Sequence, residues 1–161
     1  MIRSQESNAI PWDASRKLRW EDFKGKPFKT AWAAATTASG ISYSYTGQER
    51  AEGYELQFEV GAYFYPEKSW YQPKLCDEAI LRHEQLHFDI SELYARKFRN
   101  ELKKAHFTKN VKAEVRAIYN AILDELHKLQ SQYDYETNYS RDPGNQLAWE
   151  KKLAKALMEG R

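Results

Sequence analysis

The stretch that decides the fold runs from residue 80 to residue 90 and reads Ile80-Leu81-Arg82-His83-Glu84-Gln85-Leu86-His87-Phe88-Asp89-Ile90. Its centre has the pattern H-E-x-x-H, which is typical of zinc-dependent hydrolases. On a helix each residue turns by about 100°, so His87 lies about 40° around the axis from His83 and one turn along it. Two imidazoles in this arrangement can bind one zinc ion at about 2.0–2.1 Å.

The glutamate of the motif has a different predicted role. Glu84 projects about 60° away from His87, at the edge of the same helix face. It is placed to hydrogen-bond a zinc-activated water without binding the ion itself, so we predict that Glu84 is a general base. The corresponding hypothesis is hydrolysis of a peptide bond, in which Glu84 takes a proton from water and passes it to the leaving amine.

The helix around the motif is amphipathic, with both histidines inside its apolar side. It begins after Pro73, with acidic residues in its first turn, and its pattern ends at about Ala105. A core histidine bonded to a backbone carbonyl would show the same burial, so the apolar side alone does not prove a metal site. The apolar residues within about 80° of His83 are Leu75, Ala79, Ile80, Leu86, Ile90, Leu93, Tyr94 and Phe98.

Length and composition predict one domain spanning residues 1–161, with residues 1–17 as an extended N-terminal segment. The net charge of +2, with basic residues dispersed among acidic ones, predicts no nucleic-acid partner. No apolar run approaches the length of a transmembrane segment, and residues 1–14 lack the apolar core of a signal peptide. Localisation is therefore undetermined, between a cytoplasmic protein and an exported one shown without its leader.

The first half of the chain predicts an antiparallel pair of strands. Residues 31–45 and 54–65 have strand patterns, and residues 46–53 between them predict a hairpin loop. The second strand is the clearer one because its apolar and polar residues alternate strictly. The apolar residues of that alternation are Tyr54, Leu56, Phe58 and Val60.

The second half of the chain predicts helices. After the motif helix, Thr108 or Asn110 can cap a second helix, and Asp142-Pro143-Gly144 predicts the start of a last one. The polar segment between these two helices, residues 132–140, predicts a loop. The fold class is therefore α+β, with an N-terminal antiparallel sheet followed by a helical half that carries H-E-x-x-H on a long helix.

A zinc site for hydrolysis needs a third protein ligand and an open position for water. The motif helix cannot supply this ligand, because Asp89 and Glu92 point away from His83 on helix geometry. His106 and His127 fall outside the motif helix and are more typical of surface or packing histidines. The segment 132–140 is the best source, although it also fits an aromatic and acidic turn that packs on the last helix. Its candidate ligands are Asp134, Glu136 and Tyr139.

Several further blocks of sequence accompany the motif, and together they span most of the chain. They are Trp20-Glu21-Asp22-Phe23-Lys24-Gly25, the strand Ala33–Tyr45, Ser69-Trp70, residues 83–90 and Tyr133-Asp134-x-Glu136-Thr137. With these blocks the chain resembles the DUF922 family of bacterial proteins, which look like zinc-dependent peptidases with a zincin-like core. The resemblance implies Zn2+ as the cofactor and a peptide or protein as the substrate. Family members look exported, which implies a periplasmic or secreted protein if a leader was removed.

One position departs from the family pattern. In that pattern the Tyr-Asp-x-x-Thr segment is followed, two residues after the Thr, by a histidine that is a natural third ligand. In this chain that position is Tyr139, and a neutral phenol with a pKa near 10 is a poorer zinc ligand than imidazole. The resemblance therefore implies Tyr139 as third ligand, with Glu136 or Asp134 as alternatives. Tyr139 could instead donate a hydrogen bond to the oxyanion.

Two other functions fit the same residues. In the first, the chain is a catalytically impaired pseudo-peptidase, and an aromatic surface around Trp70, Tyr71 and Tyr135 binds protein or glycan. In the second, zinc is purely structural, but such sites are closed by four protein ligands, often Cys, and Cys76 is the one cysteine available. A zinc metallopeptidase, with Glu84 as its base, is the function that the sequence favours.

Overall fold

The computed structural model describes residues 8–28 and 32–159. Residues 1–7 of the predicted N-terminal segment, and Ala31 at the predicted start of the first strand, lie outside the described residues. The strands are β1 (Ile10–Pro11), β2 (Ala35–Thr36), β3 (Ser39–Arg50), β4 (Gly53–Phe64) and β5 (Trp70–Tyr71). The helices are η1 (Trp20–Asp22) and η2 (Pro66–Lys68), which are short 3-10 helices, and α1 (Glu78–Lys104), α2 (Val111–Glu136) and α3 (Pro143–Glu159).

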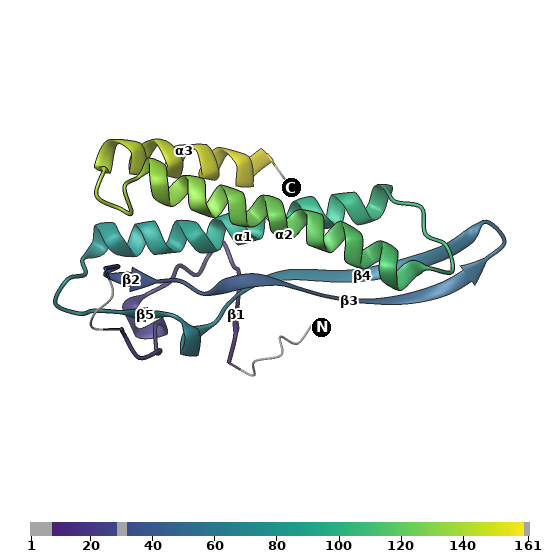
Figure 1. Cartoon of the computed structure of the whole chain (residues 1–161), viewed down its shortest axis with the longest axis horizontal. Helices are drawn as coiled ribbons and strands as arrows, with labels where there is room; N and C mark the ends of the chain where they lie inside the picture. The colour runs from purple at the N-terminus through teal and green to yellow at the C-terminus, as the bar shows by residue number, and fades with distance from the viewer. Residues whose placement is uncertain (1–7, 29–31, 160–161) are drawn as a thin grey trace.

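The sheet is dominated by the long antiparallel hairpin of β3 and β4 (Figure 1). Its register runs without interruption from the pair Ser39 and Phe64 to the pair Arg50 and Gly53. The predicted hairpin loop over residues 46–53 is therefore wrong, because only residues 51–52 form the turn. This end of the hairpin is largely exposed, so neither face of its strands has to be apolar. Its polar sequence therefore lacks the alternation of apolar and polar residues from which strands are predicted.

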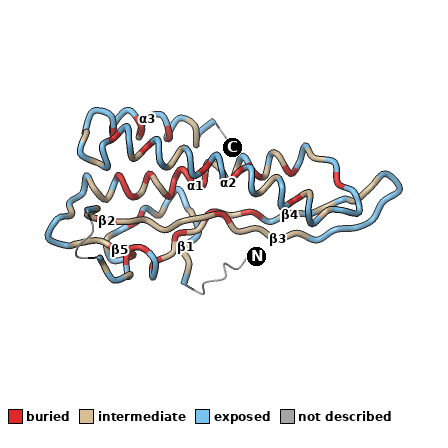
Figure 2. Tube along the Cα trace, viewed as in Figure 1, coloured by how far each residue is buried: buried red, intermediate tan, exposed pale blue. Residues whose placement is uncertain are grey.

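The helices pack on the hairpin in layers. Figure 1 shows α1 between the hairpin and the other two helices, α2 and α3, and α1 contacts all of these elements. Figure 2 shows buried residues along much of α1, and they run from His83 to Leu102. Phe88, Ile90 and Phe98 of this helix are buried in the core together with Phe64 of β4. The predicted α+β architecture, with a sheet first and helices after it, is confirmed.

The boundaries of α1 and α3 follow their capping signals. The Asp77 side chain accepts a hydrogen bond from the Ile80 backbone N–H at 2.9 Å and caps α1. The Asp142 side chain does the same for α3, accepting from the Asn145 N–H at 3.0 Å. Within the described residues, no helix is both long and apolar enough to cross a membrane.

The end of α2 differs from the prediction. The segment 132–140 was predicted as a loop, but α2 continues through Glu136 and only the following residues turn. The physical reason is Tyr133, which is fully buried against Trp149 of α3 at a ring distance of 5.2 Å. Tertiary packing therefore holds the last turn of α2 helical despite a polar sequence with weak helix preference. As a result Asp134 lies on a helix.

A pair of glycine substitutions tests the hairpin turn. Gly53 has φ +124°, and an added Cβ would lie 2.6 Å from the Phe107 carbonyl oxygen, which accepts a hydrogen bond from Tyr54. We expect Gly53→Ala to lower the free energy of unfolding by about 2 kcal/mol or more. Gly144→Ala is the matched control, because Gly144 lies in α3 without a positive φ and its Cβ meets only an ordinary contact at 3.6 Å.

For this control we expect a gain of about 0.4–1 kcal/mol, because alanine restricts the unfolded chain and fits a helix. Urea denaturation of the two variants and the parent protein gives the measurement. Equal stability of Gly53→Ala and the parent would contradict the geometry of this turn.

Candidate metal centre

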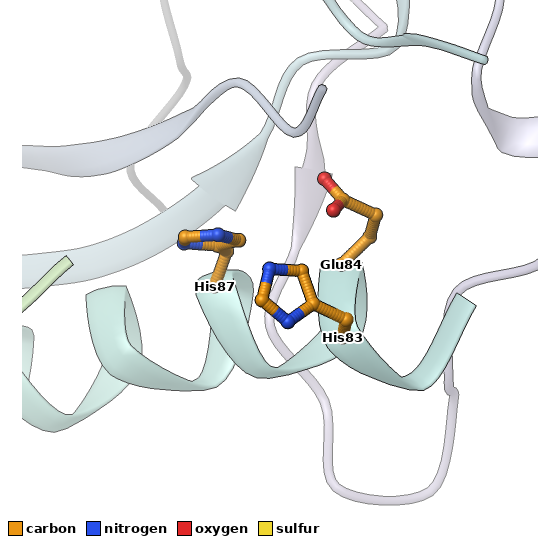
Figure 3. A group of neighbouring side chains, drawn as sticks. All are labelled: His83, Glu84 and His87. Atoms are coloured by element: carbon orange, nitrogen blue, oxygen red, sulfur yellow. The ribbon is translucent and has the colours of Figure 1, made fainter. Parts of the chain in front are cut away.

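The two histidines of the motif converge as their spacing predicts. Their ring centroids lie 5.0 Å apart on successive turns of α1. Figure 3 shows both rings and the Glu84 carboxylate projecting from this helix. One potential ligand atom of each of the three residues lies within 4.8 Å of the other two. His83 and Glu84 are buried and His87 is half-buried, so the cluster lies at the inner end of a cleft.

Asp134 is the predicted ligand candidate that faces both imidazoles. Its Oδ1 atom lies 2.9 Å from His83 Nε2 and 2.7 Å from His87 Nε2. The carboxylate reaches this point because Asp134 lies in the last turn of α2, which packs alongside α1. Two ring nitrogens and one carboxylate oxygen therefore share one small volume.

The opposite nitrogens of the two rings are held by amide oxygens. His83 Nδ1 bonds to Gln146 Oε1 of α3 at 2.8 Å, and His87 Nδ1 bonds to Gln130 Oε1 of α2. The orientation of Gln130 is fixed, because its amide NH2 donates to the His87 carbonyl at 2.9 Å. Since an amide oxygen can only accept, each Nδ1 carries a proton. When such a ring is neutral, its unprotonated nitrogen is Nε2, which faces Asp134.

This arrangement demands a positive charge between the three residues. Two Nε2 lone pairs and a carboxylate oxygen within 3 Å repel one another unless a proton or a cation lies among them. In the metal-free protein a proton fulfils this role. Burial opposes the imidazolium of His87, but the hydrogen bond to Asp134 and the nearby Glu84 charge raise its pKa to about 8. Burial also opposes ionisation of Asp134, yet hydrogen bonds from both histidines hold its pKa well below the usual range.

Tyr133 fixes the orientation of the histidine rings. Its ring stacks on His83 at a centroid distance of 4.5 Å and meets His87 edge-on at 4.9 Å. Its hydroxyl lies 2.9 Å from the His83 carbonyl oxygen and 3.0 Å from Gln146 Oε1. Burial raises the pKa of this phenol far above its ordinary value, so it stays neutral. Tyr133 is therefore a packing residue that keeps the rings in place.

Glu84 lies on the side of the centre that faces β2. Its Oε1 atom accepts a hydrogen bond from the Thr37 hydroxyl at 2.9 Å, which holds the carboxylate in one orientation. Both residues line a cleft of about 450 Å³, within the usual range for ligand sites. The cleft is lined by residues 32–37, by residues of α1, and by residues 139–141, of which Tyr139 and Arg141 are exposed and so lie at its rim.

The other candidate ligands have different surroundings. Tyr139 lines the cleft, but its ring meets Trp32 edge-on at 4.3 Å. Glu136 is exposed, and its carboxylate accepts a hydrogen bond from the Gln132 amide at 2.6 Å. The structure thus brings Asp134 to the imidazoles, leaves Tyr139 at the cleft rim and keeps Glu136 on the surface of α2.

The aromatic surface predicted around Trp70, Tyr71 and Tyr135 does not form an open groove. Trp70 is only 7% exposed, and the Tyr71 ring stacks on Trp20 at 4.8 Å. Tyr135 is 81% exposed on α2. The prediction failed because two of the three rings stabilise the core around β5.

Sequence reasoning missed the residues that support the histidines. Gln130 could have been found, because it lies one helical turn before Asp134 and so on the same face of α2. The spacing was not used because the end of this helix was wrongly predicted as a loop, where helical spacing does not apply. Gln146 carries no such signal, because its contact depends on how α3 docks against α1.

The comparisons with known proteins point to one family. Residues 12–141 match the family described as "Bacterial protein of unknown function (DUF922)". No curated protein and no solved structure matches the chain. The matched range contains His83, Glu84, His87, Gln130 and Asp134, so every residue of the centre except Gln146 lies inside it.

The charge at the centre predicts how stability depends on pH in chelator-treated protein. The pKa of His87 rises from 6.5 to about 8 on folding, so its protonated form stabilises the fold below about pH 6.5. This stabilisation is lost as the pH rises through about 8. We expect the free energy of unfolding to fall by about 2 kcal/mol across this window.

Urea denaturation at a series of pH values, in the presence of a chelator, measures this fall. His87→Gln should abolish it, whereas His127→Gln, which alters an exposed histidine of α2, should retain it. A flat stability profile between pH 6.5 and 8 in the parent protein would show that no such charge forms.

Proposed function

The chain belongs to the DUF922 family, and from this premise and the geometry of the centre we propose that it is a zinc-dependent peptidase. One observation carries the proposal. Asp134 Oδ1 lies within 2.9 Å of two imidazole Nε2 atoms whose Nδ1 atoms are both tied to amide oxygens. That arrangement gathers three potential zinc donors beside a buried glutamate, and one potential ligand atom each of His83, Glu84 and His87 lies within 4.8 Å of the other two.

The residues present fit zinc by the chemistry of their donors. Two imidazole nitrogens and one carboxylate oxygen are a ligand set that zinc uses in catalytic sites, where a fourth position stays open. The amide partners of His83 and His87 supply the outer contacts that such sites require. When bound there, zinc would act as a Lewis acid on a water and on a substrate carbonyl.

The protein's own residues then have separate roles. His83, His87 and Asp134 hold the ion, and Gln130 and Gln146 keep the two rings in the tautomer that can bind it. Each of these contacts comes from a helix, so the site is built on rigid elements.

Glu84 is the proposed general base. The Thr37 hydroxyl binds Oε1 of this carboxylate, which leaves Oε2 as the atom that accepts a proton from water. Glu84 would then deliver this proton to the leaving amine. Because Glu84 is buried and lines the cleft next to both histidines, its carboxylate would lie beside the attacked carbonyl of a bound peptide.

Substitution of the base tests the chemistry separately from metal binding. We expect Glu84→Gln to keep one zinc per chain while hydrolysis of a fluorogenic peptide library falls by about 10²-fold or more. Metal analysis and initial rates on the same preparation give the two values. Glu136→Gln is the control, because it makes the same chemical change on an exposed residue of α2.

Unchanged hydrolysis in Glu84→Gln would remove the proposed base. A parent protein that holds no zinc, and whose melting temperature does not change when zinc is added, would favour the pseudo-peptidase instead.

A second set of substitutions identifies the third ligand. We expect Asp134→Ala to weaken zinc binding by about tenfold or more, because it removes the oxygen that faces both imidazoles. Tyr139→Phe and Glu136→Ala should bind zinc as the parent does. Competition with a chromophoric chelator measures the three dissociation constants. Loss of affinity in Tyr139→Phe with none in Asp134→Ala would reassign the ligand to the phenol.

A further inference from the structure

The turn that follows α2 has an unusual backbone. Asn138, Tyr139 and Ser140 are three consecutive residues with positive φ, at 47°, 54° and 81°. Such a conformation costs free energy at each residue that is not glycine. Backbone hydrogen bonds hold it, among them those from the Tyr139 N–H to the Asp134 carbonyl at 2.8 Å and from the Asp142 N–H to the Thr137 carbonyl at 2.9 Å. The turn is thereby tied to the residue that faces the two histidines.

The turn places one cation at the rim of the cleft. Arg141 is the only lysine or arginine among the cleft-lining residues, all of which belong to the described part of the chain. Its guanidinium lies over the Trp32 ring at 4.5 Å from the ring centroid. Within the described residues, 8–28 and 32–159, Arg141 forms no ion pair.

Exposed apolar side chains line the same cleft as this cation. Trp32, Leu75 and Tyr139 line the same cleft and are 60%, 58% and 44% exposed. Large apolar side chains gathered around a cleft and left in contact with water are typical of a ligand-binding surface. The two aromatic rings also hold one another, because Tyr139 meets Trp32 edge-on at 4.3 Å.

We propose that Arg141 is a specificity-determining residue that binds a carboxylate of the peptide substrate. The inference rests on the proposed peptidase function and names its substrate class, which is a peptide with a carboxylate close to an apolar side chain. The carboxylate is either the C-terminal one or the side chain of an aspartate or glutamate. The contact with the Trp32 ring restrains the guanidinium, and its planar set of N–H groups, which no ion pair engages within the described residues, favours a two-bond contact with a carboxylate.

The charges of the cleft strengthen this assignment. Glu84 and Asp134 are the carboxylates that line the cleft, and they would offset the charge of a bound divalent ion. Arg141 then remains as the cleft-lining side chain, among the described residues, whose positive charge is not offset by an ion pair, which favours a substrate carboxylate beside it. The contact would orient the peptide along the cleft, with an apolar side chain against Trp32 and Leu75.

Binding of three matched peptides tests the proposal without requiring turnover. The probes are acetyl-Ala-Ala-Leu-Ala with a free C-terminal carboxylate, its C-terminal amide, and acetyl-Ala-Glu-Leu-Ala amide. Calorimetry uses the full zinc-loaded chain carrying Glu84→Gln, which cannot complete the proposed reaction. We expect at least one carboxylate probe to bind about tenfold tighter than the neutral amide, and the tighter probe identifies the carboxylate source.

Substitutions in the same background assign the preference to one side chain. Arg141→Gln should abolish it, and Arg141→Lys should keep only part of it, because an ammonium lacks the planar fork of donors. Arg116→Gln, which alters an exposed arginine of α2, should bind all three probes as the parent background does. Arg141 is itself exposed, so its variants should melt at the parent temperature.

Equal binding of the three probes, or no measurable binding of any of them, would overturn the proposal, as would a preference that survives Arg141→Gln. Failure of the two proposals can be told apart. Hydrolysis by the parent without a carboxylate preference removes the role of Arg141 alone. An Arg141-dependent preference without any hydrolysis removes the peptidase and leaves a carboxylate-binding cleft.

Discussion

The helical half depends on one contact, in which a single carboxylate oxygen of Asp134 lies between Nε2 of His83 and Nε2 of His87. Three acceptors at this distance are stable only with a positive charge among them. All three helices contribute to holding them there, since α1 carries the histidines, α2 carries Asp134 and Gln130, and α3 carries Gln146. The packing of α2 and α3 against α1 therefore also brings the residues of the centre together.

If this cluster served only to hold the helices together, it would lower the stability of the fold relative to an apolar interface. Burying ionisable groups requires that every polar atom find a partner, and a purely apolar interface between three helices would avoid that cost. Here both Nδ1 atoms, the Glu84 carboxylate and the Tyr133 hydroxyl have partners, while the two Nε2 atoms share one oxygen. The two Nε2 atoms and the Asp134 oxygen therefore still require a proton or a metal cation among them. Binding of the proposed metal and docking of the helices would thus be coupled, because the candidate ligands meet only in the folded chain.

The sequence allowed the histidine pair to be predicted because its geometry is local. A spacing of four residues on one helix fixes the relation of His83 to His87 whatever the rest of the chain does. The third residue is not local, and the segment holding Asp134 was predicted as a loop because its composition is polar. Burial of Tyr133 against α3 decides that the segment is helical, and this packing cannot be inferred from residues 132–140 alone. The same limit applies to Gln146, whose place is set by the docking of α3.

The block Tyr133-Asp134-x-Glu136-Thr137 can now be given a physical meaning. Tyr133 packs on the His83 ring, Asp134 faces both imidazoles, and the buried Thr137 hydroxyl donates to the Tyr133 carbonyl at 2.7 Å where α2 ends. All three residues help to build the centre or to end α2, whereas Tyr139 lies in the strained turn beyond them. With Asp134 as the proposed third ligand, a divalent ion and its protein ligands would carry a net charge of about +1, instead of the +2 that a third imidazole would leave. The centre would then attract anions less strongly, and the guanidinium of Arg141 would become the stronger determinant of where a negatively charged ligand lies in the cleft.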